Sequence, residues 1–219
     1  MAASTASRTT GAAARTRRTL VEAATEAFAE QGVFTASLVD ITRRAGQRNR
    51  GAVHYHFGSR DGLIVAVVDQ HAAFLARREG ELLELALERP DDDLTSVLEA
   101  IVRPAVELAE AGTDGRRYLM IIGQLVEEYD RVHPEVTAAL ERTGGMPVYA
   151  LLQARLPAYD EALLNERMAL VTSFILRSVA DRARAHGSDA PGRAQLPTER
   201  FVANLVAMAV GMATAPLPE

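Results

Sequence analysis

The feature that most constrains the fold of this chain is the spacing of its apolar residues, which recur every three or four positions almost from end to end. Leu20, Ala24 and Phe28 form one such stripe, and residues spaced by four lie on one face of an α-helix. No segment shows sustained alternation of apolar and polar residues, and no Asn-Gly or Asp-Gly turn joins two β-branched runs. The sequence therefore predicts an all-α protein.

Caps, glycines and prolines divide this pattern into separate helices. Thr16 is a candidate N-cap for the first helix, and Gly32 is a candidate stop. Ser37 can cap a second helix, with Asp40 returning the bond as in a capping box, and Gly46 ends it. We expect further helices at about 49–57, 59–87, 92–110 (with a kink at Pro104), 115–131, 134–143, 147–156, 159–186 and 198–213.

Charge is distributed unevenly along the chain. Residues 1–60 contain nine Arg and four acidic residues, a net charge of +5, whereas the remainder carries a net charge of −10. Basic surfaces attract polyanions and acidic surfaces repel them. The asymmetry predicts a polyanion-binding region attached to a body that does not bind polyanions, and chance clustering of charge is the alternative.

The composition and spacing exclude several kinds of site. The chain has no cysteine, which rules out disulfides, thiolate metal sites and cysteine nucleophiles and fits a reducing cytoplasm. The longest apolar tract, Phe201–Ala215, is too short to span a bilayer and contains Asn204. His54 and His56 are two positions apart and so do not face each other on a helix. We expect a cytoplasmic protein with no metal, no cofactor and no membrane partner.

Residues 41–60, ITRRAGQRNRGAVHYHFGSR, concentrate five Arg and two His in twenty positions. Two short helices joined by a tight polar turn form a helix-turn-helix, whose second helix enters the major groove of DNA. Gly51 and Ala52 remove bulk where the backbone would approach DNA, and Val53 and Phe57 are spaced to anchor the inner face of that helix. The segment therefore predicts DNA binding.

The segment TLVEAATEAFAEQGVFTASLVDITRRAGQRNRGAVHYHFGSRDGL resembles the N-terminal region of the TetR family of bacterial transcriptional regulators. The matching pieces are EAATEAFAEQG, a small residue and Ser before LVDI, RAG, and GAVHYHFGSRDGL. Three departures stand beside them: the turn QRNR has four residues where the family commonly has three, His54 occupies the usual Tyr position, and Arg60 replaces Lys. The resemblance covers about residues 16–65.

This resemblance implies a three-part regulator. We expect a flexible basic arm over residues 1–14, a three-helix helix-turn-helix DNA-binding domain over 15–60, and a larger helical domain for effector binding and dimerisation over 61–219. Repression is the usual mode of the family. The implied function is a ligand-responsive homodimeric repressor that binds a palindromic operator in double-stranded DNA and is released by a small-molecule effector.

Side chains that donate hydrogen bonds near the second helix of the motif are the candidate DNA contacts. We expect base reading by Arg48, Asn49 and Arg50, close backbone approach at Gly51, and contact between Ala52 and a thymine methyl group. The candidate phosphate contacts are Arg17, Ser37, His54, Tyr55 and Arg60. Arg43 and Arg44 also fit a solvated helix face, and His56 fits packing beneath the recognition helix.

The last two helices carry apolar residues over an arc wide enough for two partners, their own core and a second subunit. A single short domain reads too few base pairs to select an operator, which also favours a dimer. The resemblance implies a four-helix interface, and burial in a monomeric core is the alternative. The candidate interface residues are Leu164, Met168, Val171, Ile175, Phe201, Leu205, Met208 and Met212.

The middle helices, at about 92–156, are expected to enclose the effector pocket that the resemblance implies. Each candidate for its lining also fits a position in the core or on the surface. These candidates are Tyr118, Met120, Gln124, Tyr129, His133, Phe174 and Arg177.

Two rival interpretations stay open. A helical adaptor that has lost DNA binding fits the all-α pattern, with the longer turn QRNR as its support. A helical enzyme is the other, but TGGMP at 143–147 and GTDG at 112–115 lack a phosphate-loop pattern, and DDD at 91–93 fits a helix cap. We therefore expect no catalytic residues and no enzyme activity.

Overall fold

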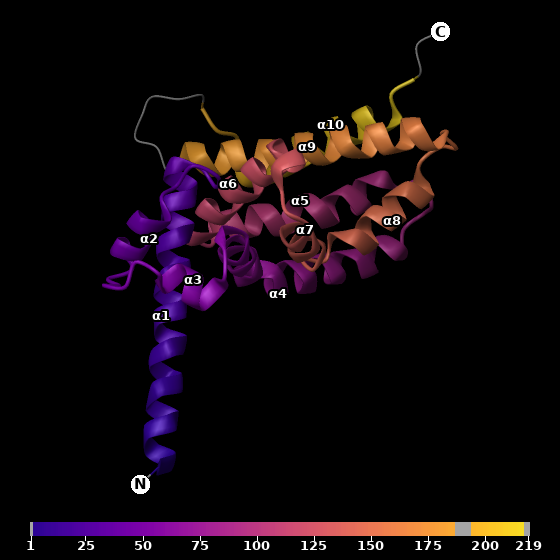
Figure 1. Ribbon diagram of the computed structural model, residues 1–219. Helices are drawn as coiled ribbons and strands as arrows, with labels where there is room; N and C mark the ends of the chain where they lie inside the picture. Colours follow the sequence, from indigo (N-terminus) through magenta and orange to yellow (C-terminus); the bar gives the residue numbers. More distant parts are fainter. Residues whose placement is uncertain (1, 187–193, 217–219) are drawn as a thin grey trace.

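The computed structural model describes residues 2–186 and 194–216, with side chains from Gly11 onward. Within these ranges the chain forms ten α-helices and one short 3-10 helix, and no strand. The all-α prediction is confirmed (Figure 1). Helices α1, α2 and α3 form a small N-terminal unit, called the head below. Helices α4 to α10 form the larger unit beside it, called the body (Figure 1).

Helix α1 (Ala2–Gln31) begins well before the position expected from the sequence. Thr16 therefore lies inside the helix and is not its cap, and most of the arm expected over residues 1–14 is helical, with Met1 outside the described residues. Six of the residues from Ala2 to Ala14 are alanine, the residue with the strongest helix propensity. This N-terminal half of α1 projects beyond the rest of the head (Figure 1). Its second half buries Leu20 and Phe28 completely in the head.

Two short helices follow: α2 (Leu38–Arg44) packs against α1, and α3 (Ala52–Phe57) packs against α2 and the start of the body. The Ser37 hydroxyl caps α2 by accepting a hydrogen bond from the Asp40 amide at 3.4 Å, as predicted. The start predicted for the next helix, at Asn49, is three residues too early. The Asn49 side chain accepts a hydrogen bond from the Gly51 amide at 2.9 Å, and such a local side-chain bond favours a turn over a helix.

The body begins with α4 (Arg60–Leu87), whose Ser59 cap accepts a hydrogen bond from the Gly62 amide at 3.0 Å. Pro134 occupies the first turn of α7, as expected. The elements after α4 are α5 (Leu94–Glu110), α6 (Thr113–Glu127), the 3-10 helix η1 (Tyr129–Arg131), α7 (Pro134–Glu141), α8 (Gly145–Arg155), α9 (Glu161–His186) and α10 (Thr198–Thr214).

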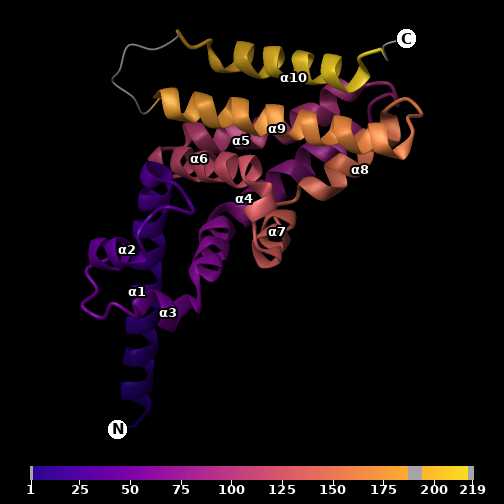
Figure 2. The same ribbon diagram turned by 45° about the horizontal axis from the view of Figure 1, so that its top comes forward.

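Helix α5 lies among the other helices of the body and contributes much of its core. Leu98 of α5, Ile121 of α6 and Ile175 of α9 are completely buried, and each such side chain stabilises the fold by about 1.5–3 kcal/mol. Helices α9 and α10 lie side by side along the edge of the body (Figures 1 and 2). None of the helices in the described ranges is both long and apolar enough to cross a membrane.

Candidate nucleic-acid interface and effector cavity

The turn before α3 and the first half of α3 present the exposed donors of the head. Arg48, Asn49 and Arg50 lie in the turn and are exposed. His54 and Tyr55 follow on α3, and Tyr55 is 80% exposed. Guanidinium, amide, imidazole and phenol groups all donate hydrogen bonds to bases or phosphates. The structure therefore brings together five of the predicted DNA contacts on one surface, and their roles at DNA stay predictions.

Ala52 does not belong to this exposed surface. Its side chain is 5% exposed and lies in the core of the head with Val53, so it does not point towards a thymine methyl group. The physical reason is the later start of α3: Ala52 is its first residue and turns inward, while Gly51 before it is exposed. A Cβ atom at position 51 would lie 3.3 Å from the side-chain oxygen Oδ1 of Asn49.

Two arginines predicted to contact phosphates are engaged within the protein. The Arg60 guanidinium donates hydrogen bonds to the carbonyl oxygens of Val33 at 3.0 Å and Ala36 at 2.7 Å, and burial lowers the pKa of Arg60. The Arg17 guanidinium donates to the carbonyl oxygen of His56 at 2.9 Å and lies 4.4 Å from the centre of the Phe57 ring. Arg17 therefore ties α1 to α3 within the head, and Arg60 ties the start of α4 to the segment between α1 and α2.

Arg44 of α2 takes part in an ion-pair network between α2 and α1. Its guanidinium contacts the carboxylates of Asp40 at 2.8 Å and Glu30 at 2.9 Å. Arg43 and then Arg44 hold the pKa of Asp40 below its usual value. The Asp40 carboxylate thus pairs with both arginines, and Arg44 also joins α2 to α1 through Glu30.

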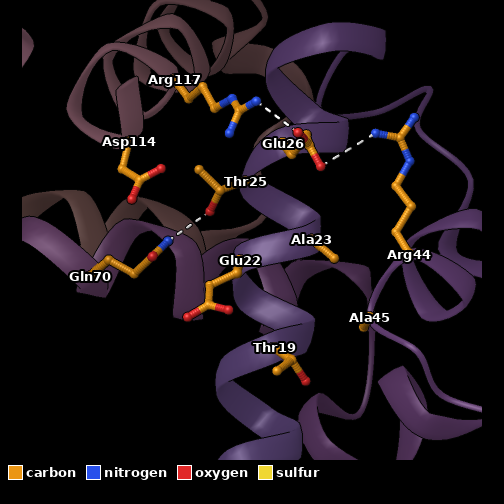
Figure 3. A pocket seen from close by; sticks show the side chains of 10 residues that line it. All are labelled: Thr19, Glu22, Ala23, Thr25, Glu26, Arg44, Ala45, Gln70, Asp114 and Arg117. Atoms are coloured by element: carbon orange, nitrogen blue, oxygen red, sulfur yellow. Dashed lines mark hydrogen bonds and ion pairs between the residues drawn. The ribbon is translucent and has the colours of Figure 1, made fainter. Parts of the chain in front are cut away.

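Glu26 of α1 links the head to the body (Figure 3). One of its carboxylate oxygens lies 2.7 Å from Nη2 of Arg117 on α6, and the other lies 3.8 Å from Nη1 of Arg44 on α2. Close by, the Gln70 amide of α4 donates to the Thr25 hydroxyl at 2.8 Å. These residues border a polar hollow of about 330 Å³.

A second contact between head and body involves the segment that follows α1. The backbone amide of Val33 donates a hydrogen bond to the side-chain carbonyl of Gln124 on α6 at 2.9 Å. Gln124 and Arg117 are seven positions apart, so both project from one face of α6. Helix α6 therefore holds the head at two points.

The body encloses an apolar cavity of about 310 Å³, which opens near the exposed residues Tyr129 and Met146. Two of the seven predicted lining residues, Tyr118 and Tyr129, belong to it. The described residues that line it are Leu75, Glu79, Ile101, Ala105, Tyr118, Leu119, Ile122, Val126, Tyr129, Thr137, Leu140, Glu141, Thr143, Gly145, Met146, Tyr149, Thr172 and Leu176.

The other five predicted lining residues lie outside this cavity. Gln124 faces the head, and the His133 ring accepts a hydrogen bond from the Glu135 amide at the start of α7. Arg177 pairs with Glu127 at 2.8 Å on the surface. Phe174 borders a different hollow between α9 and α10, and Met120 packs against the core. These residues have suitable side chains, but their helix faces point away from the cavity.

Two polar groups in the cavity wall lack hydrogen-bond partners among the described residues. They are Oε2 of Glu79, whose side chain belongs to a residue only 7% exposed, and the hydroxyl of Tyr118, which is 1% exposed. Burial raises the pKa of Glu79 to about 8 and also raises the pKa of Tyr118. Glu79 was not predicted from the sequence, because the surrounding ARREGE pattern is typical of a solvated helix face.

The residues predicted for the dimer interface divide into two sets. Met168, Val171, Ile175 and Leu205 are buried in the core of the same chain, so they are not free to meet a partner. Leu164, Phe201 and Met212 are partly buried, and Met208 is 49% exposed. The exposed face of α9 and α10 carries Leu170 and Met208 among small residues, namely Ala169, Ser173, Ala203, Ala207 and Gly211.

Comparison with known proteins identifies both units. The family described as "Bacterial regulatory proteins, tetR family" matches residues 20–67. The family described as "Tetracyclin repressor-like, C-terminal domain" matches residues 99–212, which is more than half of the chain. The first match contains the helix-turn-helix, and the second contains most of the body.

Curated relatives agree with these matches. The HTH-type transcriptional repressor Rv3405c of Mycobacterium tuberculosis is 34% identical over 158 residues, which cover 72% of this chain and 68% of the relative. The HTH-type transcriptional regulator SrpR of Pseudomonas putida is 31% identical over 137 residues, which cover 63% of this chain and 60% of the relative. The match thus spans less than two thirds of SrpR.

Solved structures share the fold at low sequence identity. The TetR family transcriptional regulator PfmR from Thermus thermophilus superposes with a TM-score of 0.52 at 19% identity, covering 90% of this chain and 99% of that chain. The transcriptional regulator FadR from Bacillus subtilis, in complex with stearoyl-CoA, superposes with a TM-score of 0.52 at 13% identity, covering 91% and 99%. The helix-turn-helix, the helical body and these matches together show that the chain belongs to the TetR family of bacterial transcriptional regulators.

Proposed function

We propose that this protein is a homodimeric repressor whose two heads bind a palindromic operator and leave it when a small molecule occupies the cavity of the body. It acts in the cytoplasm by binding and not by catalysis. The observation that carries the proposal is the double role of α6. Tyr118 and Ile122 line the cavity from this helix, while Arg117 and Gln124 hold the head.

The arrangement of α6 supplies a physical route from effector to operator. A ligand that displaces Tyr118 or Ile122 moves the helix that carries Arg117, whose ion pair with Glu26 reaches α1. Packed helices shift as units because their interiors are close-packed. A shift of α6 therefore changes where the head is held, and a dimer needs both heads at a fixed spacing to reach two half-sites.

The surface of the head supports operator binding. Arg48 and Arg50 extend from the turn without an ion-pair partner among the described residues, next to the exposed Tyr55. A net charge of +5 over residues 1–60 attracts DNA, and the net charge of −10 on the remainder keeps DNA from binding elsewhere.

The exposed face of α9 and α10 supports a dimer. Leu170 is 52% exposed and Met208 is 49% exposed, and such apolar side chains on one surface mark interaction sites. Ala169, Ala207 and Gly211 beside them are small, which allows two helix pairs to approach closely. Two copies joined here form a four-helix interface with twofold symmetry.

The test is DNA binding by the purified full chain, measured as fluorescence anisotropy with DNA from upstream of its own gene. We expect a sequence-preferring complex that weakens steeply with rising salt. Arg50→Ala is expected to lower the affinity by about 1–3 kcal/mol and to relax the preference at one base pair. Arg77→Ala is the matched control, because Arg77 is exposed on the body and pairs with Glu81.

Two results would count against the proposal. One is the absence of any complex with that DNA at low salt, together with a stable partner protein, which is the behaviour of a helical adaptor. The other is an affinity of the Arg50→Ala variant equal to that of the Arg77→Ala control. Sedimentation of the free protein as a monomer at micromolar concentration would contradict the dimer.

A further inference from the structure

We propose that the cavity of the body binds a lipophilic organic cation, an apolar molecule with a substituted ammonium group, and that Glu79 is the residue that recognises this group. The inference rests on the proposed ligand-responsive function and names the chemical class of the effector. It is carried by the unpartnered carboxyl group of Glu79, by the aromatic and apolar walls around it, and by the charges of the lining residues.

The carboxyl group of Glu79 is buried without a full set of partners. Glu79 is 7% exposed, and its Oε2 has no hydrogen-bond partner in the described part of the chain. A buried polar group without a partner costs about 1–3 kcal/mol, and more if it is charged. A ligand that brings a cation to this oxygen removes the penalty, so the cavity is prepared for such a group.

The cavity wall has carboxyl groups but no cationic side chain among the described residues. Glu79 and Glu141 are the acidic residues that line it, and none of the lining residues is Arg or His. A carboxylate or phosphate ligand would meet two acidic groups with no compensating cation. The wall therefore selects against anions and in favour of cations.

The wall also has an aromatic part. Tyr118, Tyr129 and Tyr149 contribute rings to the lining, and the rest of it is largely aliphatic. The faces of tyrosine rings attract ammonium groups, most strongly where water is excluded. A volume of about 310 Å³ suits a small ligand whose hydrocarbon part fills the aliphatic end.

The glycine pair of the TGGMP segment closes the cavity over the carboxyl group. Gly144 has φ +102°, and a Cβ atom there would lie 2.5 Å from the Cα of Ala76 and 3.1 Å from Oε2 of Glu79. Only glycine allows the start of α8 to approach α4 this closely. The segment thus serves to shield Glu79 from solvent, a role that its sequence alone did not indicate.

The titration of Glu79 provides an independent readout. Burial raises its pKa to about 8, so the free protein holds a proton there at neutral pH. A quaternary ammonium cannot lose its charge, and its binding must release this proton. Its affinity is therefore expected to rise with pH, by up to about tenfold per unit between pH 6 and pH 8.

The other titratable groups near this site are not expected to produce the pH dependence of ligand binding that Glu79 produces. Burial raises the pKa values of Tyr118 and Tyr149, so both hydroxyls stay neutral in this range. His71 packs edge-on against the Tyr118 ring, with 4.9 Å between ring centres, and burial lowers its pKa. Tyr129 and Glu141 also line the cavity, and the charge of Asp69 contributes to the raised pKa of Tyr118. The Glu79→Gln variant separates the contribution of Glu79 from theirs.

The experiment uses three probes that share a phenylbutyl body: trimethyl(4-phenylbutyl)ammonium, 4-phenylbutanol and 4-phenylbutyrate. Calorimetric titration of the full chain is expected to show the ammonium binding at least about tenfold more tightly than the alcohol, with no binding of the carboxylate. Glu79→Gln is expected to abolish this preference and its pH dependence. Glu84→Gln, which removes an exposed carboxylate of the same helix outside the cavity, is the matched control and is expected to keep both.

Equal binding of the ammonium and the alcohol by the unmodified protein would overturn the inference, as would an undiminished preference in Glu79→Gln. Circular dichroism of each variant confirms that it is folded. Operator release is measured in the same samples. Binding of the ammonium without release of the operator would support the inference and count against the proposed ligand response. Release of the operator by the alcohol or the carboxylate alone would support the ligand response and count against the inference.

Discussion

The head and the body carry their functional groups in opposite ways. In the head, the candidate DNA contacts Arg48, Asn49, Arg50, His54 and Tyr55 are close in sequence and exposed. In the body, the cavity is lined from six α-helices, α4 to α9, and its most distinctive group, Glu79, is buried. A function that depends on a local segment can be read from its sequence, whereas one that depends on packing requires the structure.

The two units also differ in what their charged groups do. Several arginines of the head are engaged with other groups of the head, as Arg17 is with the carbonyl oxygen of His56 and Arg44 is with Glu30, while Arg48 and Arg50 are exposed. The carboxyl group of Glu79 in the body has no partner for Oε2 among the described residues. The head thus combines hydrogen-bonded arginines with exposed donors, whereas the body buries a carboxyl oxygen that has no partner among the described residues. The following experiments test this contrast.

The largest effect is expected from the core of the head. Phe28 is completely buried, so Phe28→Ala should lower the free energy of unfolding by about 3–5 kcal/mol through lost burial and a remaining cavity. Urea unfolding followed by circular dichroism measures this change. Val39→Ala, at an apolar residue of the head that is 55% exposed, is the control and should change stability by less than about 0.5 kcal/mol.

This experiment also tests whether head and body fold together. The Glu26–Arg117 and Val33–Gln124 contacts lead us to expect one cooperative transition in the variant as in the unmodified protein. A separate early transition, with the body unfolding at its original urea concentration, would show that the two units are independent.

The next effect concerns the interior of the body. The pKa of Glu79 rises from 4.5 to about 8 on burial, so between these pH values the folded protein binds more protons than the unfolded chain. The stability that Glu79 contributes is full below pH 4.5, is lost as the pH rises to about 8, and stays constant above. Between pH 6 and pH 8 the free energy of unfolding should fall by about 2 kcal/mol more in the unmodified protein than in Glu79→Gln.

Unfolding curves of both proteins at several pH values provide this difference, and the subtraction removes the titration of every other group. If the free energy of unfolding depended on pH in the same way in both proteins, the Glu79 carboxyl group would be hydrated. The contrast between head and body would then fail.

A third effect, of similar or smaller size, is a difference in stability between the variants of two arginines, Arg60 and Arg50. Arg60→Ala leaves the carbonyl oxygens of Val33 and Ala36 without their donor, which should lower the free energy of unfolding by about 1.5–2 kcal/mol. Arg50→Ala should lower it by less than about 0.5 kcal/mol, because Arg50 is exposed. Thermal unfolding of both variants measures this difference in stability. Equal stability of the two variants would contradict the structural role of Arg60.

The smallest effect is expected at the junction of the two units. Arg117→Ala removes an ion pair with Glu26 between body and head, and Arg142→Ala removes one with Asp69 within the body. Each should lower the free energy of unfolding by no more than about 1 kcal/mol. Operator affinity, measured by fluorescence anisotropy, should change only in Arg117→Ala, and an equal change in both variants would contradict a role of the junction in DNA binding.

Much of the fold could be predicted because helix signals are local. Ser37 caps α2 and Pro134 starts α7, as their neighbours in sequence indicate. The early start of α1 and the late start of α3 were missed, because an alanine-rich segment extends the first helix and the Asn49 side chain holds a turn. Boundaries depend on such competition between local bonds and helix propensity.

The sites were predicted less evenly, for the same physical reason. The exposed donors of the head follow one another along the chain, so the motif located them, but Ala52 was assigned to the wrong side of α3. In the body, the candidate Tyr118 lies in the cavity wall, whereas the candidate Arg177 pairs with Glu127 on the surface. Which face of a helix is inward depends on contacts between distant segments, and Glu79 shows that even a charged residue can be buried.

The bonds made by Arg17 and Arg60 have a consequence for how this protein can diverge. Both guanidinium groups bind main-chain carbonyl oxygens, those of His56, Val33 and Ala36, and every amino acid carries such an oxygen. The side chains at the exposed positions of the turn can therefore be exchanged without loss of these anchors. If the turn reads bases as proposed, mutation there can thus retarget the protein to new operator sequences on an unchanged framework.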